Sequence, residues 1–420
     1  AESDTARKRT ADLQDLLWSM QEVLAGGNAL LPLLSPSILA ARELSPAEIK
    51  QLDPGKILGI ILEAGAPGSH LSILARSLQI PLIIGIPLPK TSHMHAAVLD
   101  GNLGRLFLDP NEETLKKYRS TLAAGKTAEK ALAAYIEKRA VLLSGKKLPV
   151  LANISQLAEL KAAKAQGAEG IGLFRSEFLF LEDKTLPDEE TQFQYYRQLL
   201  TEMDGMEVTI RTADLGADKS SPTLPHRKEP KPALGLRGIR LSLSCPELFR
   251  TQLRALLRAS CYGRLAILYP MITSLSEIRE IRMHLYELRE ELKSGGIPLG
   301  DFRQGIMIET PAAVELSDLL AKEVDFFSIG TNDLCQYTLA LDRSNPSLAG
   351  YFEPHHEAIL RQIKRTVENA HAAQIPVRIC GELGADISLT KELLELGIDA
   401  FSVAAGDVPA VRKAILDSGL

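Results

Sequence analysis

The chain has 420 residues, of which 45% are apolar and 24% charged, and its formal net charge is −5. This length suits two or three domains of an ordinary globular protein. The charge predicts no general attraction for nucleic acid or anionic membranes, and no apolar run approaches the roughly 20 residues of a membrane span. The N-terminus is polar, and the four cysteines lack CxxC spacing. We therefore expect a cytoplasmic protein that binds neither nucleic acid nor membranes.

The first third of the chain predicts a helix, a small domain and a connector. Residues 6–25 place leucines at helical spacing. Residues 28–110 alternate apolar runs with one helical segment and predict a small α/β domain. Its expected elements are strands at 56–62 and 80–86, a helix at 71–78 and a hairpin at 98–108 that turns at Asp100-Gly101. Residues 111–147 are rich in Ala, Lys and Glu and predict a helical connector between two domains.

Residues 148–420 alternate apolar strands with helical segments. The expected strands are 150–153, 170–174, 208–212, 235–239, 265–271, 305–308, 326–329 and 377–380, of which 235–239 is the least strand-like. Eight strands with intervening helices over about 270 residues is the size of a (β/α)₈ TIM barrel. The fold class is therefore α/β, a small domain followed by a barrel.

Basic side chains follow several of these strands. Arg175, Arg211 and Arg237 lie at or near strand ends, and Lys219 lies on the loop after Arg211. Active sites of such barrels lie at the carboxyl ends of the strands, where arginines can bind phosphate and carboxylate bidentately. One such arginine alone is more readily explained as a surface ion pair. Three at strand ends favour an anion site.

Two carboxylates and a thiol follow later strands. Glu309 and Asp333 end the sixth and seventh predicted strands, and their oxygens suit Mg²⁺, although each could instead cap a helix. Cys380 follows the last predicted strand, where a thiol could deliver a proton to a ligand. Buried cysteines are usually inert, and residue chemistry alone favours that structural role.

One histidine lies in a distinctive loop. His70 ends the sequence Gly-Ala-Pro-Gly-Ser-His, which follows a predicted strand and opens a helix. Free amide groups and the helix dipole favour an anion at such a position, and imidazole is a competent nucleophile near neutral pH. For an isolated Ser-His pair, a helix-capping histidine without chemistry remains the simpler explanation.

Together the segments resemble Enzyme I of the phosphoenolpyruvate:sugar phosphotransferase system over almost the whole chain. The matching motifs occupy 172–180, 211–219, 234–240, 308–313, 325–334, 341–345 and 380–382, in the family's order. The resemblance implies a swivelling phosphohistidine domain at 28–110, a linker at 111–147 and a barrel at 148–420 that binds phosphoenolpyruvate. It also implies that residues 1–27 are the last helix of a subdomain that docks the phosphocarrier HPr.

The resemblance implies a role for each matched residue. His70 accepts the phosphoryl group, and Cys380 protonates the enolate so that pyruvate leaves. The substrate is held by Arg175, Arg211, Lys219, Arg237, Asn332 and Arg343. Glu309 and Asp333 ligate Mg²⁺. The implied partners are an HPr or HPr-like carrier and a second copy of the chain, paired through the barrel.

This sequence departs from the family in two ways. The family's histidine loop usually reads Gly-Gly-x-Thr-Ser-His, whereas Gly68 replaces the threonine here and removes a hydroxyl partner for the phosphohistidine. We expect only the last helix of the helical subdomain, at residues 1–27, so the chain resembles the Enzyme I portion of a multiphosphoryl transfer protein or a trimmed Enzyme I. Two alternative functions stay open: an ATP-dependent phosphoenolpyruvate synthase or pyruvate phosphate dikinase, and a module that senses phosphoenolpyruvate without catalysis.

Overall fold

The computed structural model describes residues 35–44, 54–64, 75, 80–88, 96–181, 186–216, 232–342, 345, 348, 351, 353 and 355–420. The chain divides into two compact units, Ala1–Thr127 and Ala128–Leu420. The predicted helix at 6–25 and most of the one at 71–78 lie outside the described residues, as do His70, Lys219 and Arg343. The predicted domain boundaries stay predictions.

The first unit contains a small parallel sheet and a hairpin. Strands β1 (Ser37–Ala41), β2 (Ile57–Leu62) and β3 (Leu82–Ile84) pair in that order. Ile57, Ile60 and Leu62 of β2 build the core of this sheet, together with Ala75 and Ile80. The hairpin joins β4 (Ala97–Asp100) to β5 (Arg105–Leu108), and the Asp100 carboxylate caps its turn by accepting two backbone amides.

A long helix, α4 (Glu112–Ala133), follows the hairpin and crosses the boundary between the units. Two acidic residues open this helix, as its dipole favours. The rest of the predicted connector is not helical, because it contains turns and a short antiparallel bridge between Val141 and Lys147. Within the second unit, the buried Arg412 donates to the carbonyls of Tyr135 and Ile136 and so anchors the end of this connector.

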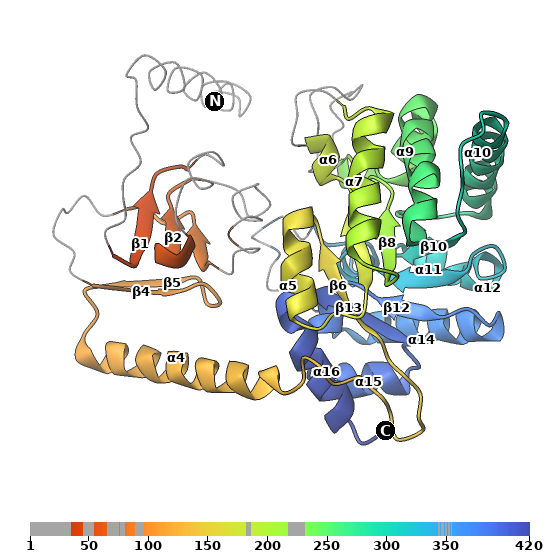
Figure 1. Cartoon of the computed structure of the whole chain (residues 1–420). Coiled ribbons are helices and arrows are strands. Elements are labelled where there is room, and N and C mark those ends of the chain that lie inside the picture. The colour runs from red at the N-terminus through yellow and green to blue at the C-terminus, as the bar shows by residue number, and fades with distance from the viewer. Residues whose placement is uncertain are drawn as a thin grey trace, which may run out of the picture. The chain divides into compact units, whose positions relative to one another are not determined.

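The second unit is a closed barrel of eight parallel strands surrounded by helices, as predicted (Figure 1). The strands are β6 (Val150–Ile154), β7 (Ile171–Arg175), β8 (Glu207–Arg211), β9 (Arg264–Tyr269), β10 (Phe302–Ile308), β11 (Phe326–Ile329), β12 (Val377–Ile379) and β13 (Ala400–Ala404). Alternate residues of each strand face the helices and the lumen. Ile306 and Ile308 of β10, for example, belong to the large core under the helices, and Met307 belongs to a smaller cluster with Phe326.

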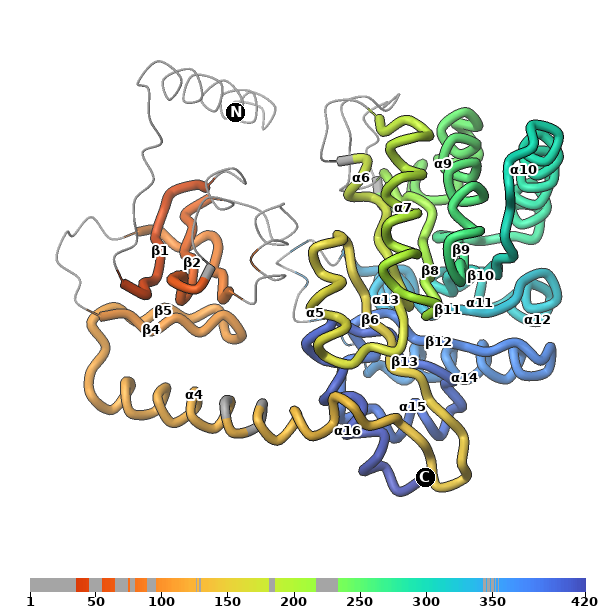
Figure 2. Tube along the Cα trace, viewed as in Figure 1, coloured from red at the N-terminus to blue at the C-terminus, as the bar shows by residue number. Residues whose placement is uncertain are grey.

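The helices of the outer layer differ greatly in length. They are α5 (Leu160–Ala165), α6 (Phe178–Leu181), α7 (Glu189–Glu202), α8 (Ile239–Ser244), α9 (Pro246–Ala259), α10 (Leu275–Ser294), α11 (Pro311–Glu315), α12 (Ser317–Leu320), α13 (Thr331–Thr338), α14 (Glu357–Ala372), α15 (Thr390–Glu395) and α16 (Val408–Asp417). Helices α7, α9 and α10 stand side by side (Figure 2). A capping box at Ser274 and Glu277 fixes the start of α10.

The structure corrects one predicted strand and adds another. Residues 235–239 are not a strand: residues 235–238 form the loop that leads into α8, which begins at Ile239, and Leu236 in this loop is exposed. The missing strand is β13, which pairs with β12 and β6 and closes the barrel. As a consequence, Arg237 does not end a strand but lies on the connection between β8, which ends at Arg211, and β9.

Arginines close the amino-terminal end of the barrel. Arg378 of β12 donates to Thr209 and pairs with Glu207, both on β8. Strands β8 and β12 are separated by three strands in either direction, so these contacts must cross the lumen. The Phe326 ring lies 4.5 Å from the Arg378 guanidinium and 5.1 Å from that of Arg303. These side chains fill the lumen at the end opposite the predicted site.

Candidate active site

The described site residues gather at the carboxyl end of the barrel strands. Arg175 and Arg211 are the last residues of β7 and β8, and Glu309 and Cys380 directly follow β10 and β12. Asn332 and Asp333 lie in the first turn of α13, just after β11. Because all eight strands are parallel, these positions share one end of the barrel.

Arg237 connects two aspartates. Its guanidinium donates to both carboxylate oxygens of Asp214 at 3.0 Å and to both of Asp333 at 2.9 Å. Gly238, with a φ of 56°, follows it, and a side chain there would collide with Met271. Although burial opposes the charged form, Asp214 and Asp333 outweigh it and raise the pKa of Arg237. The bridge thus fixes the β8–β9 connection against α13.

Arg211 is held in a second buried network. Its guanidinium contacts Glu177 at 2.8 Å and Asp214 at 3.4 Å. Glu177 also accepts the backbone amide of Asp214 at 2.8 Å. Burial opposes ionisation, but the carboxylates of Glu177 and Asp214 raise the pKa of Arg211 overall. The two arginines therefore share Asp214 and form one continuous array.

Glu177 and Asp214 were missed by the sequence analysis. Both lie inside motifs that were recognised, two residues after Arg175 and three after Arg211. That proximity to an arginine was the local signal, but only the fold brings the two carboxylates together. Both side chains are 1% exposed, so neither is an incidental surface group.

Arg175 differs from the other two arginines because its side chain reaches solvent. Within the described part of the chain it makes no ion pair. Crowded surroundings lower its pKa by desolvation, and the positive charge of Arg211 lowers it further. A guanidinium that is held at the rim without a carboxylate partner is well suited to bind an anion from solution.

Glu309 is a buried carboxyl group in an acidic environment. It accepts the amide of Met271 at 2.7 Å, and Met271 adopts a left-handed φ of 58° that is uncommon for a non-glycine residue. Gly330 approaches so closely that a Cβ there would lie 2.7 Å from a Glu309 carboxylate oxygen. Burial, followed by the charges of Asp333 and Asp214, raises the pKa of Glu309 to about 8.

These carboxylates fit a hard divalent cation. Burial raises the pKa of Glu309, and the negative charges of Asp333 and Asp214 add to this effect; a cation beside Glu309 and Asp333 would relieve the repulsion between these carboxylates. In the described part of the chain, no set of three His, Cys, Asp or Glu side chains is arranged to hold a metal. A cation held by these two carboxylates would leave coordination positions for water or substrate oxygens, which is usual for Mg²⁺.

Cys380 is a buried thiol, 3% exposed, at the same end of the barrel. Its Sγ donates to the Ile329 carbonyl at 3.4 Å, and its own carbonyl accepts the Asn153 amide at 3.1 Å. Burial raises the pKa of the thiol to about 11, although the Ser328 hydroxyl beside it acts in the opposite direction. The group is consequently a protonated acid at neutral pH.

Asn332 has a structural contact in this arrangement. Its side-chain oxygen accepts the amide of Glu382 at 3.1 Å, which connects α13 to the loop after Cys380. The amide nitrogen of Asn332 is the part of this side chain that could bind a substrate oxygen. The first turn of α13, which carries Asp333, therefore also holds the loop after β12 in place.

Comparison with known proteins identifies the family of this chain. Residues 129–419 match the family model described as PEP-utilising enzyme, PEP-binding domain, and residues 33–104 match PEP-utilising enzyme, mobile domain. The chain is 40% identical over 417 residues to phosphoenolpyruvate-protein phosphotransferase of Haemophilus influenzae, covering 97% of this chain and 72% of that relative. This chain belongs to the phosphoenolpyruvate-protein phosphotransferase, or Enzyme I, family of PEP-utilising enzymes.

Other members of the family show similar coverage. The relatives from Geobacillus stearothermophilus and Bacillus subtilis are each 38% identical, and 98% and 99% of this chain match 72% and 74% of their lengths. These relatives bear the name of the phosphotransferase, which favours neither the ATP-dependent alternative nor the sensor. In the part of the chain that the structure describes, no helix is long and apolar enough to cross a membrane.

Proposed function

We propose that this chain transfers the phosphoryl group of phosphoenolpyruvate to His70 and releases pyruvate. The observation that carries the proposal is the joint placement of Arg175, Arg211, Glu309, Asp333 and Cys380 at one barrel end, in a member of the Enzyme I family. Such an end combines anion-binding, cation-binding and proton-donating groups. Lys219 and Arg343 are assigned to substrate binding from their family motifs.

The arginines bind and orient the substrate in this proposal. Arg175 at the rim, with Arg211 behind it, receives the phosphate, and the Asn332 amide holds a further substrate oxygen. Arg237 keeps Asp333 in position through its bridge to Asp214. Glu309 and Asp333 would hold Mg²⁺, which would supply positive charge to offset that of the phosphoryl oxygens. His70 then forms a bond to phosphorus while the bond from phosphorus to the enolate oxygen breaks.

Cys380 completes the reaction. Its S–H proton passes to the methylene carbon of the enolate, which becomes the methyl group of pyruvate, and the thiolate regains a proton from water. A thiol with a pKa of about 11 is neutral when this step begins and readily becomes protonated again afterwards. The Ile329 carbonyl and the Asn153 amide hold the residue in place for the transfer.

Partners and location extend the proposal. We assign the downstream acceptor to an HPr or HPr-like carrier, movement of the small domain to a hinge in residues 111–147, and dimerisation to the barrel. All four cysteines are free, which suits the reducing cytoplasm. Transfer of label from the phosphorylated chain to added HPr tests the carrier, and analytical ultracentrifugation tests the dimer.

Radiolabelling tests the central proposal. The chain is incubated with ³²P-phosphoenolpyruvate and Mg²⁺, and we expect an acid-labile, base-stable label that His70→Ala abolishes and His95→Ala retains. EDTA should prevent labelling if Mg²⁺ is required. Labelling that survives in His70→Ala would disprove the assignment of the acceptor. Saturable binding without any label favours the sensor, and formation of ATP when AMP is added together with phosphate or pyrophosphate favours the ATP-dependent alternative.

A further inference from the structure

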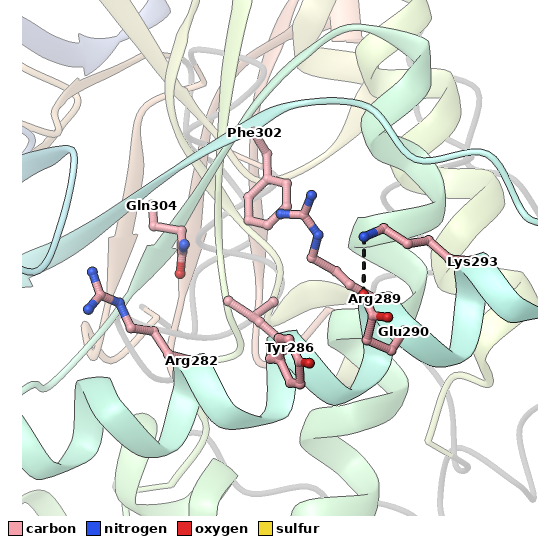
Figure 3. A pocket seen from close by; sticks show the side chains of 8 residues that line it. Arg282, Tyr286, Arg289, Glu290, Lys293, Phe302 and Gln304 are labelled. Carbon is pink, nitrogen blue, oxygen red and sulfur yellow. Dashed lines mark hydrogen bonds and ion pairs between the residues drawn. The ribbon is translucent and has the colours of Figure 1, made fainter.

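A cleft of about 270 Å³ lies on the outside of the barrel between α10 and the start of β10 (Figure 3). It is lined by Arg282, Leu285, Tyr286, Arg289, Glu290, Lys293, Phe302 and Gln304. Phe302 and Gln304 are the first and third residues of β10, whereas Glu309 follows the last residue of that strand. The cleft is therefore separate from the candidate active site.

The cleft exists because the helical layer is incomplete here. Helix α10 has 20 residues, whereas α11 and α12, which follow β10, have only five and four. These short helices leave the first residues of β10 partly exposed, so that Phe302 and Gln304 form a floor. Arg282 closes one side by donating to the Glu323 carbonyl at 2.6 Å and pairing with its carboxylate.

Basic side chains outnumber acidic ones in the lining of the cleft. Three of its side chains are cationic, and Glu290 is the one acid among the lining residues. Arg282 is paired with Glu323, and Lys293 contacts Glu290 at 3.1 Å between exposed side chains. Arg289 differs: within the described residues it makes no ion pair, and its guanidinium lies 5.6 Å from the centre of the Phe302 ring. Figure 3 shows it directed into the cleft beside that ring.

Neighbouring arginines emphasise this exception. Arg250 and Arg254 of α9 lie beside α10, and both contact Glu291 of that helix. Glu291 is thus paired with arginines of α9. Arg289 is half-buried and lies beside the aromatic ring of Phe302. A half-buried guanidinium without an acidic partner is an anion-binding group.

We propose that this cleft binds a small planar organic anion, namely an aromatic or other unsaturated carboxylate. Arg289 and Lys293 receive the carboxylate, and the flat body of the ligand packs against Phe302 and Tyr286. The Gln304 amide offers one further polar contact. The volume of about 270 Å³ lies just below the usual range for ligand pockets, which restricts the occupant to a small molecule.

The shape of the walls distinguishes this ligand class from a simple anion. Inorganic phosphate would meet the two cations but leave the Phe302 and Tyr286 surfaces uncovered. A neutral aromatic would cover those surfaces but leave Arg289 without an anionic partner. A ligand that has both parts gains from both, since apolar burial and charge-assisted hydrogen bonds contribute separately.

Titration of the full chain with three probes tests the proposal. The probes are benzoate, benzyl alcohol and inorganic phosphate, and binding is followed by ¹H–¹⁵N NMR shifts. We expect saturable binding of benzoate that Arg289→Gln weakens about tenfold, corresponding to the loss of one charge-assisted hydrogen bond. Arg279→Gln, on an exposed position of the same helix outside the cleft, should leave benzoate affinity unchanged.

The other probes and a second variant give decisive outcomes. Benzyl alcohol should bind at least tenfold more weakly than benzoate, and phosphate should produce only small shifts. Arg289→Lys keeps the charge and should retain part of the affinity, so a general loss of folding in Arg289→Gln can be recognised. The proposal is overturned if benzoate does not bind, if Arg289→Gln binds it normally, or if phosphate binds as tightly.

Discussion

The two ends of the barrel are both built from arginines and carboxylates, but in opposite proportions. At the amino-terminal end one carboxylate, Glu207, contacts Arg378, Arg303 and Arg264. At the carboxyl-terminal end the four carboxylates Glu177, Asp214, Glu309 and Asp333 surround two buried arginines. In the first arrangement the single carboxylate is surrounded by positive charge, whereas in the second the carboxylates lie close to one another.

The pKa values of two glutamates record this difference. Burial opposes ionisation of Glu207, but Arg378 and Arg303 outweigh it and hold its pKa below the ordinary value. Burial and the neighbouring aspartates act together on Glu309 and raise its pKa to about 8. Unfavourable electrostatics of the second kind are typical of functional sites. The comparison therefore assigns stability to one end and chemistry to the other, and it can be tested from both sides.

The largest effect is expected from Arg237→Lys at the carboxyl-terminal end. Lysine keeps the charge but cannot bridge Asp214 and Asp333 with two pairs of hydrogen bonds, so Asp333 loses its position. We expect His70 phosphorylation to slow by about 10²–10³-fold, measured by single-turnover labelling. Arg240→Lys, at an exposed position three residues further along, is the control and should keep the normal rate. A decrease of less than tenfold would show that the bridge does not position the site.

Arg378→Met at the opposite end should reduce stability instead of activity. It removes a buried arginine and leaves the partly buried Glu207 with only partial compensation, and we expect a loss of about 3 kcal/mol in the free energy of unfolding, measured by urea titration. Below the unfolding transition the labelling rate should stay within about threefold of the normal rate. Arg264→Met removes an arginine with a 69% exposed side chain, 4.0 Å from the same carboxylate, and should cost under about 0.5 kcal/mol. Equal losses in both variants would contradict the assignment of Arg378 as the buried partner.

Glu309→Gln should increase stability, unlike Arg378→Met. A carboxyl group whose folded pKa is raised opposes folding increasingly as pH rises from the unfolded value of 4.5 to about 8, and fully above it. Glutamine can still accept the Met271 amide but carries no charge. Without divalent cations we expect a gain of about 1–3 kcal/mol at pH 9 that shrinks towards zero near pH 5, while phosphorylation is lost. Thermal unfolding in EDTA at both pH values measures it, and a gain independent of pH would exclude relief of charge as its cause.

The sequence predicted the barrel from strands that are locally distinctive, and it failed where strand character depends on distant residues. The β10 segment has an apolar run that any sequence window detects, whereas β13 (Ala400–Ala404) consists largely of small residues. Ser402 faces Gly172 of β7 so closely that a Cβ at 172 would lie 2.2 Å from its hydroxyl. The small size of β13 residues is therefore set by packing across the lumen, which no local pattern reveals.

Residue type and strand position selected the candidate site residues, but they did not predict the hydrogen bonds and ion pairs between them. Glu309, Asp333 and Cys380 could be selected because each follows a strand of a parallel barrel. Glu177 and Asp214 could not, since their partners Arg211 and Arg237 are 34 and 23 residues away in the chain. Arg237 itself was placed on a strand that does not exist, and its assignment to substrate binding, which rests on its motif, stays a prediction.

The smallest effect is expected from Ser328→Ala, inside the lumen next to the proposed acid. The Ser328 hydroxyl is fully buried, makes no hydrogen bond within the described structure, and lowers the pKa of Cys380 against the effect of burial. A hydrogen bond from this hydroxyl to the thiolate would be worth roughly 0.5–1.5 kcal/mol, so removing the hydroxyl should raise that pKa by about 0.5–1 unit. The thiolate fraction at pH 10, followed by ¹³Cβ NMR of labelled cysteine, should fall accordingly. Thr390→Ala removes another buried hydroxyl without a partner, on α15, and should leave the Cys380 signal unchanged. Because the thiol is observed directly, an unchanged thiolate fraction in Ser328→Ala would reject the contact whether or not Cys380 is the proton donor.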